Sequence, residues 1–174
     1  IHLDVQLSES TSFSLFVRIP VWAAGATIQI NGESLTRPIV PGSYVEIQRR
    51  WNSGDVVHLS FPMPIRLIAS NPRVTDNYNR VALMRGPLVY CVEQTDHPDV
   101  DIWKLVLPAR TNWEVIHKPD LLGGVVVAQA EALVASDNTW SGKLYRPYDG
   151  SRPEYKAVQL TAIPYYAWAN REPG

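Results

Sequence analysis

Short stretches in which apolar and polar residues alternate constrain this chain more than any other feature of its sequence. Successive side chains of a β-strand point to opposite faces, so an alternation with a period of two residues predicts a strand with one buried face. The clearest example sets one apolar series against a mostly polar one: Phe13, Leu15, Val17 and Ile19 against Ser12, Ser14, Phe16 and Arg18. No segment keeps a helical period over its length, so the sequence predicts an all-β fold.

Turn-forming residues separate the alternating stretches. Asn31-Gly32 follows the apolar series of residues 26, 28 and 30, and this pair tolerates the positive φ angles of a tight hairpin turn. Pro41-Gly42 and the sequence NSGD at 52–55 mark two further turns. We therefore predict that residues 1–64 form an antiparallel meander within a jelly-roll-like β-sandwich.

The apolar run from Arg80 to Asp96 is interrupted by Arg85-Gly86-Pro87. Proline gives no N–H to a sheet and glycine accepts unusual backbone angles, so the sequence predicts a bulge or a switch between sheets here. Four later strands are predicted, at 103–107, 113–117, 125–135 and 156–166. The third is ambiguous because its valines favour a strand whereas AQAEALVA contains good helix formers, and the β-rich surroundings favour the strand.

A domain boundary is expected near Pro64. Pro62 and Pro64 end the alternation, and residues 69–80 are polar and loop-like. We predict two antiparallel β-sandwich domains in tandem, residues 1–64 and 65–174.

Composition narrows the possible partners. The chain carries 16 basic and 17 acidic residues, a formal net charge of -1, and no run of lysines and arginines, so we expect no nucleic-acid partner. It has no apolar run near the roughly 18 residues that span a bilayer, so we expect no membrane partner. The first residue is Ile1, and an upstream targeting signal stays open.

Metal sites and disulfides are not expected in this chain. Cys91 is the one cysteine and lies in an apolar run, where a free thiol behaves as a small buried hydrophobe. The closely spaced carboxylates at 96, 99 and 101 fit solvated turns better than a calcium loop. The histidines are scattered without metal-ligand spacing: His2, His58, His97 and His117.

Six tryptophans and eight tyrosines raise the possibility of a sugar-binding surface, because sugar rings stack on flat aromatic faces. The candidates near predicted loops are Trp103, Trp113 and Trp140, followed by Tyr145, Tyr148 and Tyr155. The alternative is packing, because aromatic residues also fill the ends of β-sandwiches, and it is favoured for Trp22, Trp51 and Trp168.

Several short motifs together resemble the bacterial β-L-arabinofuranosidases of glycoside hydrolase family 127. They are FVRIPVW at 16–22, INGE at 30–33, RRWNSGD at 49–55, the segment 80–96 and IPYYAWANREPG at 163–174. The resemblance covers the middle and C-terminal β-domains of that family and implies a catalytic helical barrel before them. It implies a cysteine nucleophile beside a cysteine-held zinc ion in the barrel, with a glutamate as acid/base.

None of those catalytic residues maps onto this chain, so the resemblance predicts a non-catalytic β-portion with no cofactor of its own. Candidate carboxylates exist only by type, at Glu93, Asp96, Asp99 and Asp101. The resemblance also implies that the portion braces the barrel, contributes to a homodimer and belongs to a bacterial enzyme acting on plant-type glycans. The compartment stays open between cytoplasmic, periplasmic and secreted. The alternative is a carbohydrate-binding module that uses exposed aromatic residues.

Overall fold

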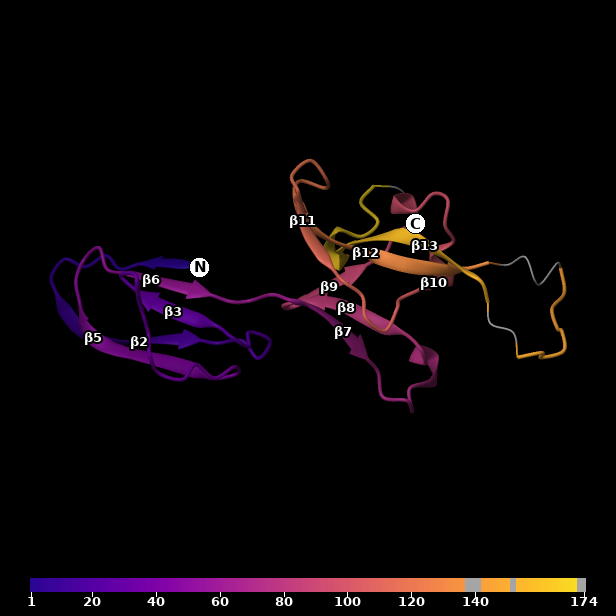
Figure 1. The fold of residues 1–174 in the computed structure, drawn as a ribbon. Helices are drawn as coiled ribbons and strands as arrows, with labels where there is room; N and C mark the ends of the chain where they lie inside the picture. The colour runs from indigo at the N-terminus through magenta and orange to yellow at the C-terminus, as the bar shows by residue number, and fades with distance from the viewer. Residues whose placement is uncertain (137–141, 151–152, 172–174) are drawn as a thin grey trace. The chain divides into compact units, whose positions relative to one another are not determined.

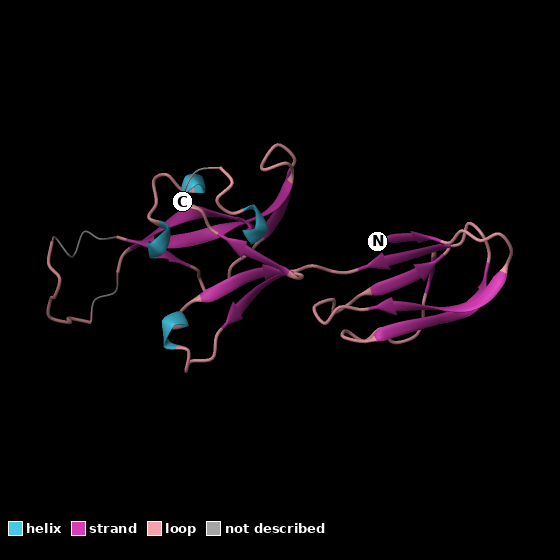
Figure 2. Cartoon of the chain, turned by 180° about the vertical axis from the view of Figure 1, so that it is seen from behind, coloured by secondary structure: helices cyan, strands magenta, loops and turns pink. Residues whose placement is uncertain are grey.

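The computed structural model describes residues 1–136, 142–150 and 153–171 (Figures 1 and 2). Strands, short 3-10 helices and loops make up these residues, which confirms the all-β prediction. Among them we find no helical segment with the length and apolar character that a bilayer span requires. The chain divides into two compact units, Ile1–Pro64 and Ile65–Gly174.

The first unit contains six strands in two sheets. One sheet has the order β1-β6-β3-β4, and β2 pairs with β5 along all eight residues of each strand. The strands are β1 (His2–Asp4), β2 (Thr11–Arg18), β3 (Thr27–Ile30), β4 (Glu33–Ser34), β5 (Tyr44–Trp51) and β6 (Val56–Ser60).

The predicted meander is wrong, because most consecutive strands of this unit do not pair. Only β3 and β4 form a hairpin with each other, whereas β2 pairs with β5 and β3 pairs with β6. The chain changes sheets four times, between β1 and β2, β2 and β3, β4 and β5, and β5 and β6. These crossings place the apolar faces of both sheets against one shared core, which a single flat meander would leave exposed on one side.

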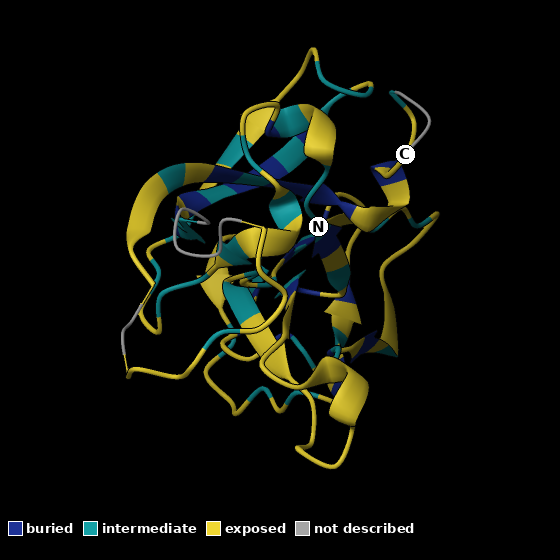
Figure 3. Cartoon of the chain, turned by 90° about the vertical axis from the view of Figure 1, so that its right-hand side faces the viewer, coloured by how far each residue is buried: buried dark blue, intermediate teal, exposed yellow. Residues whose placement is uncertain are grey.

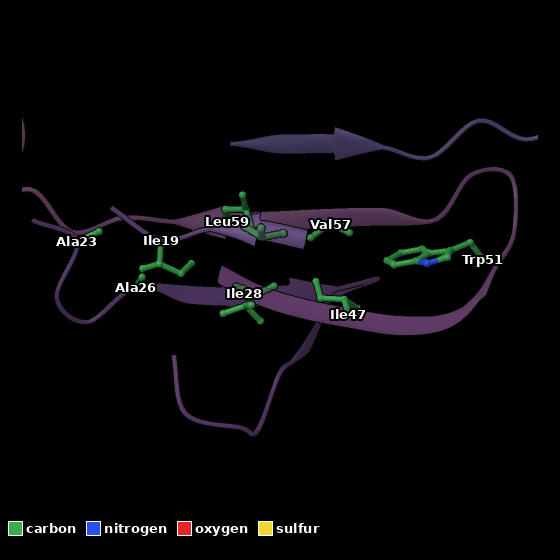
Figure 4. Close-up of a cluster of buried hydrophobic side chains, with 10 residues drawn as sticks. Ile19, Ala23, Ala26, Ile28, Ile47, Trp51, Val57 and Leu59 are labelled. Atoms are coloured by element: carbon green, nitrogen blue, oxygen red, sulfur yellow. The ribbon is translucent and has the colours of Figure 1, made fainter. Parts of the chain in front are cut away.

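The core of the first unit lies between its two sheets (Figure 4). Trp51 lies at one end of the drawn cluster and Ala23 at the other, with Ile28 and Val57 between them. Trp51 is fully buried, stacks on Phe13 and donates its indole N–H to the Phe13 carbonyl at 3.0 Å. The packing role predicted for Trp51 therefore agrees with its place in the structure.

The second unit is one seven-stranded antiparallel sheet with the order β10-β12-β13-β9-β8-β7, in which β11 pairs with a second segment of β12. Its strands are β7 (Ile65–Ala69), β8 (Val81–Arg85), β9 (Leu88–Cys91), β10 (Leu105–Val106), β11 (Glu114–Lys118), β12 (Val125–Ala135) and β13 (Tyr155–Pro164). Four single-turn 3-10 helices complete it: η1 (Thr75–Asn77), η2 (Gln94–Asp96), η3 (Ile102–Lys104) and η4 (Tyr165–Ala167).

Strand β12 is the best buried strand of this sheet, with Glu131 as its one exposed residue. Figure 3 colours the described residues by burial. Ala128 on β12 packs with Leu83 and Tyr90 of β8 and β9, so the sheet bends until these parts share one core cluster. Val125 and Val127 face the opposite side and pack in a second cluster with Ile163. Burial on both faces explains why this segment shows no clean alternation in sequence.

Two sequence predictions in this unit are corrected. Gly86 and Pro87 form neither a bulge nor a switch between sheets: Arg85 pairs with Leu88, so the two residues are the tip of a hairpin between β8 and β9. Gly86 has φ +55°, at the position that a type II′ turn reserves for glycine. The strand predicted at 103–107 is reduced to β10, because Asp101 accepts a hydrogen bond from the Trp103 N–H and caps η3 instead.

Candidate functional site

The only thiol of the chain lies half-buried against the core of the second unit. Cys91 ends β9 and packs on the cluster of Val125, Val127 and Ile163. Burial, together with the negative charge of Glu93, raises the pKa of the Cys91 thiol from 9.0 to about 11. A thiol with this pKa stays protonated near neutral pH, so it is a poor nucleophile and a poor metal ligand.

The carboxylates that follow Cys91 are engaged by one arginine from the far end of the chain. Arg171 binds Asp96 through two parallel hydrogen bonds of 2.7 Å and also contacts Glu93. Glu93 accepts a further hydrogen bond of 2.8 Å from the Ala169 N–H. The side-chain hydrogen bond with Asp96 is the main reason that the pKa of Arg171 is raised.

The arrangement of Arg171, Glu93 and Asp96 suits a structural role, in which the arginine holds two segments of the chain together, rather than hydrolysis. Glycoside hydrolysis by two carboxyl groups needs one of them to be protonated and the other to face the sugar. Here Arg171 forms ion pairs with both Glu93 and Asp96 and holds the last described residues on η2. Asp101 caps η3 and forms an ion pair of 3.6 Å with Lys104, and Asp99 is exposed in the adjoining loop.

The histidines have structural partners as well. His97 is buried; its Nε2 accepts from the Thr161 N–H at 3.0 Å while its Nδ1 lies 2.8 Å from the Glu93 carbonyl oxygen. These contacts place the proton of the neutral ring on Nδ1. His2 and His58 lie ring against ring across β1 and β6, with centroids 4.8 Å apart.

The residues present do not fit the zinc site that the family implies for its catalytic part. A cysteine-rich zinc site needs several thiolates, and Cys91 is the single cysteine, with a raised pKa. In the described ranges there is no group of three histidine, cysteine, aspartate or glutamate side chains that could hold a metal ion.

The predicted sugar-binding aromatic residues differ in their exposure. Trp103 is 83 % exposed on η3, and Tyr145 and Tyr148 are 90 % and 92 % exposed on the segment 142–150. Trp113 is half-buried and packs against the cluster that contains Leu83 and Tyr90, so one of its faces is already occupied. Trp140 lies outside the described residues, and Tyr155 is partly exposed at the start of β13.

Sequence reasoning missed one exposed aromatic group. Tyr165 and Trp168 stack with an interplanar angle of 12° and a centroid separation of 5.5 Å, and both are about half exposed. Tyr165 is the first residue of η4 and Trp168 directly follows it, and in such a turn side chains three residues apart lie on one side. The cluster of aromatic residues in IPYYAW was the signal that could have pointed to this pair.

Two shallow pockets are the best formed ones among the described residues, and the candidate aromatic residues line neither. The first lies in the first unit along β3 and the loop after β4. The second has a volume of about 360 Å³ and lies at the loop end of the β7–β8 hairpin, where Ile68, Arg80 and Ala82 line it. Trp103, Tyr145 and Tyr148 are therefore exposed side chains that line neither of these two pockets.

The fold and the comparisons with known proteins define the class as glycoside hydrolase. Residues 1–63 match the family model described as the beta-L-arabinofuranosidase GH127 middle domain, and residues 65–174 match that of the glycoside hydrolase family 127 C-terminal domain. The chain belongs to glycoside hydrolase family 127, of which it contains these two β-domains.

Characterised relatives are several times longer than this chain. A non-reducing end beta-L-arabinofuranosidase of Bifidobacterium longum is 35 % identical over 91 % of this chain, which spans 24 % of that relative. A solved GH127 beta-L-arabinofuranosidase of Geobacillus stearothermophilus T6 is 41 % identical with a TM-score of 0.88, over 98 % of this chain and 26 % of the other. A further solved GH127 beta-arabinofuranosidase is 30 % identical with a TM-score of 0.81, over 98 % of this chain and 28 % of the other.

Proposed function

We propose that this chain is the non-catalytic β-portion of a β-L-arabinofuranosidase-like glycoside hydrolase, which braces a helical-barrel catalytic part. The longer protein would remove L-arabinofuranose from plant-type glycans. The proposal rests on one combined observation. The chain matches two β-domains of the family, and its candidate catalytic side chains have structural roles. Cys91 has a raised pKa, and Arg171 forms ion pairs with the nearby carboxylates of Glu93 and Asp96.

The proposal includes a contribution to a homodimer. Support comes from strand edges that lack a neighbour among the described residues of the first unit, since β2 and β5 pair only with each other. Unpaired edges of this length are usually covered by another segment or another chain. Sedimentation of the longer protein would measure its subunit number.

An activity assay tests the central claim. We expect the 174-residue chain to give no turnover of aryl β-L-arabinofuranosides above the blank, with or without added zinc, because it has no activated nucleophile. The Geobacillus stearothermophilus relative assayed in parallel serves as the positive control. Measurable turnover that disappears in Cys91→Ser would contradict the proposal.

The second candidate function is carbohydrate binding, which the exposure of Trp103, Tyr145 and Tyr148 favours. Calorimetric titration with arabinan, arabinoxylan and pectic oligosaccharides distinguishes a carbohydrate-binding module from a bracing portion. A carbohydrate-binding module would show glycan affinity that Trp103→Ala abolishes. Trp113→Phe is the matched variant, because it keeps the half-buried ring packed and should leave such affinity unchanged.

A further inference from the structure

The outer face of the β7–β8–β9 part of the second unit is apolar where an antiparallel sheet normally presents polar side chains to solvent. Cross-strand partners share a face, and the register pairs Arg66 with Met84, Ile68 with Ala82, and Met84 with Val89. Leu83 and Tyr90 point to the other face, where they join the core. We define the outer patch as these five residues: Arg66, Ile68, Ala82, Met84 and Val89.

The outer patch is uncovered in this chain. Ile68 is 41 % and Val89 43 % exposed, and Ala82 is exposed between them. The face opposite Ile68 is also partly open, because Leu67 and Val81 extend beyond the core. Contiguous apolar side chains on both faces of one hairpin mark a surface that is buried in a larger assembly.

The same hairpin carries an unpaired strand edge. The two-residue turn makes Arg85 and Leu88 a hydrogen-bonded pair, so the backbone groups of Met84 and Ala82 point toward β7. The backbone groups of Arg66 and Ile68 form hydrogen bonds with those of Met84 and Ala82. The backbone N–H and C=O groups of Ile65, Leu67 and Ala69 therefore point to the outer edge of β7. In the part of the chain that the structure describes, no strand pairs with that edge.

The charge of this region selects an acidic partner and disfavours a second copy of the chain. The segment from Ile65 to Val92 contains four arginines and one acidic residue: Arg66, Arg73, Arg80, Arg85 and Asp76. No carboxylate lies within ion-pair distance of these arginines among the described residues. Arg66 lies on the outer patch, where its Nη2 donates to the Gly86 carbonyl at 2.9 Å, whereas Arg85 shares the opposite face with Leu83. Two copies of such a surface would repel each other.

We propose that the outer patch and the free edge of β7 dock a segment of the catalytic part of the same polypeptide, and this inference rests on the function proposed above. The docked segment is an extended strand that adds to the β7 edge. It places apolar side chains on the outer patch and at least one carboxylate near Arg66 or Arg80. The pocket at the loop end of the β7–β8 hairpin, lined by Ile68, Asn77 and Arg80, receives one of its side chains.

The size of the relatives supports this occupant. This chain spans 24 % of the Bifidobacterium relative and 26 % of the Geobacillus one, so about three quarters of each lies outside the matched part. A bracing portion must bury apolar surface against that remainder. Strand addition supplies main-chain hydrogen bonds, and the arginines specify the partner by charge.

Hydrogen–deuterium exchange tests the docking in the longer polypeptide that carries the catalytic part, with the isolated 174-residue chain as the reference. We expect the amides of Leu67 and Ala69 to exchange about 100-fold more slowly in the longer polypeptide, because an added strand would take up these edge groups. Peptides 81–85 and 88–91 should be protected as well.

Two aspartate variants provide a matched comparison. Val89 on the outer patch is 43 % exposed and Val115 on β11 is 44 % exposed. Val89→Asp should return the β7 peptides of the longer polypeptide to the exchange rate of the isolated chain, whereas Val115→Asp should leave them protected. Unchanged exchange of β12 and β13 in the isolated variants shows that both remain folded.

The other outcomes overturn the inference in distinguishable ways. Protection confined to other strands refutes the outer patch as the docking surface and leaves the bracing function standing. No protection anywhere on this chain refutes both. Protection of β7 that appears in the isolated chain as its concentration rises, with a dimer in sedimentation, would assign the edge to a second copy.

Discussion

At the scale of single residues, Asp55 shows how one buried carboxylate connects two turns of the first unit. Its Oδ2 accepts a hydrogen bond of 2.9 Å from the Asn52 N–H, and its Oδ1 accepts one of 2.8 Å from the Asn31 side chain. Arg49 lies 3.7 Å away. These contacts, led by the Asn52 backbone bond, lower the pKa of Asp55 from its ordinary value of 3.8.

A lowered pKa makes the stability of the first unit depend on acid. The charged carboxylate stabilises the fold above the unfolded-state pKa near 3.8, and this contribution is lost as the pH falls through the lower folded-state pKa. Asp55→Asn keeps an acceptor for the Asn52 N–H but cannot accept from Asn31 with its amide nitrogen. We therefore expect the variant to be less stable than the wild type at pH 7, with a difference that shrinks toward pH 3.

Urea unfolding of the two proteins at pH 7, 5 and 3 measures this difference. Asp4→Asn is the control, since Asp4 is exposed on β1. An Asp55→Asn midpoint that stays equally far below the wild type at all three pH values would count against the linkage.

Residue-scale chemistry was only partly predictable from sequence. The core position of Cys91 followed from the apolar residues around it. The pairing of Glu93 and Asp96 with Arg171 did not, because the partner is more than 70 positions away and local sequence carries no signal for it. The sequence predicted that Asp96 lies in a solvated turn. In the structure Asp96 instead forms an ion pair with Arg171, a residue distant in sequence.

At the scale of elements, turn chemistry was the most dependable guide. Asn31 and Gly32 have φ +52° and +86° and close the β3–β4 hairpin, as the two residues predict. Gly86-Pro87 also turns the chain, but its reading as a bulge failed because the strands on both sides pair with each other, which the sequence of one strand does not reveal. The segment 125–135 matched its predicted strand because β-branched residues and neighbouring strands outweighed its helix formers.

The β3–β4 turn provides a test of this backbone requirement. A Cβ at Gly32 would meet no atom within 4 Å, so Gly32→Ala changes only the cost of a positive φ. We expect a loss of about 1–2 kcal/mol in the free energy of unfolding. Gly32→Asn should cost less, because asparagine tolerates positive φ. Equal losses for the two variants in urea unfolding would show that φ is not the cause.

At the scale of the whole molecule, each unit has its own core. The buried cluster of the first unit includes Ile28, and that of the second includes Ile163, both almost fully buried. Truncating one of them removes packing from its own cluster and leaves the other cluster intact.

Differential scanning calorimetry should therefore show two separable responses. Ile28→Ala is expected to destabilise one transition by about 2–5 kcal/mol and Ile163→Ala the other by a similar amount. The unchanged transition in each variant is the internal control. A single transition that both substitutions lower together would mean that the chain unfolds as one cooperative body.

The place of β13 in the second unit has a consequence for biosynthesis. This strand follows all the other described strands in sequence, yet it lies between β12 and β9 and, among the described residues, joins the β10–β12 half of the sheet to the β7–β9 half. A nascent polypeptide that has not yet released residue 164 from the ribosome therefore holds two unconnected hairpin assemblies. The two halves of the sheet can join only after residue 164 has left the ribosome, and until then chaperones have access to both sets of strands.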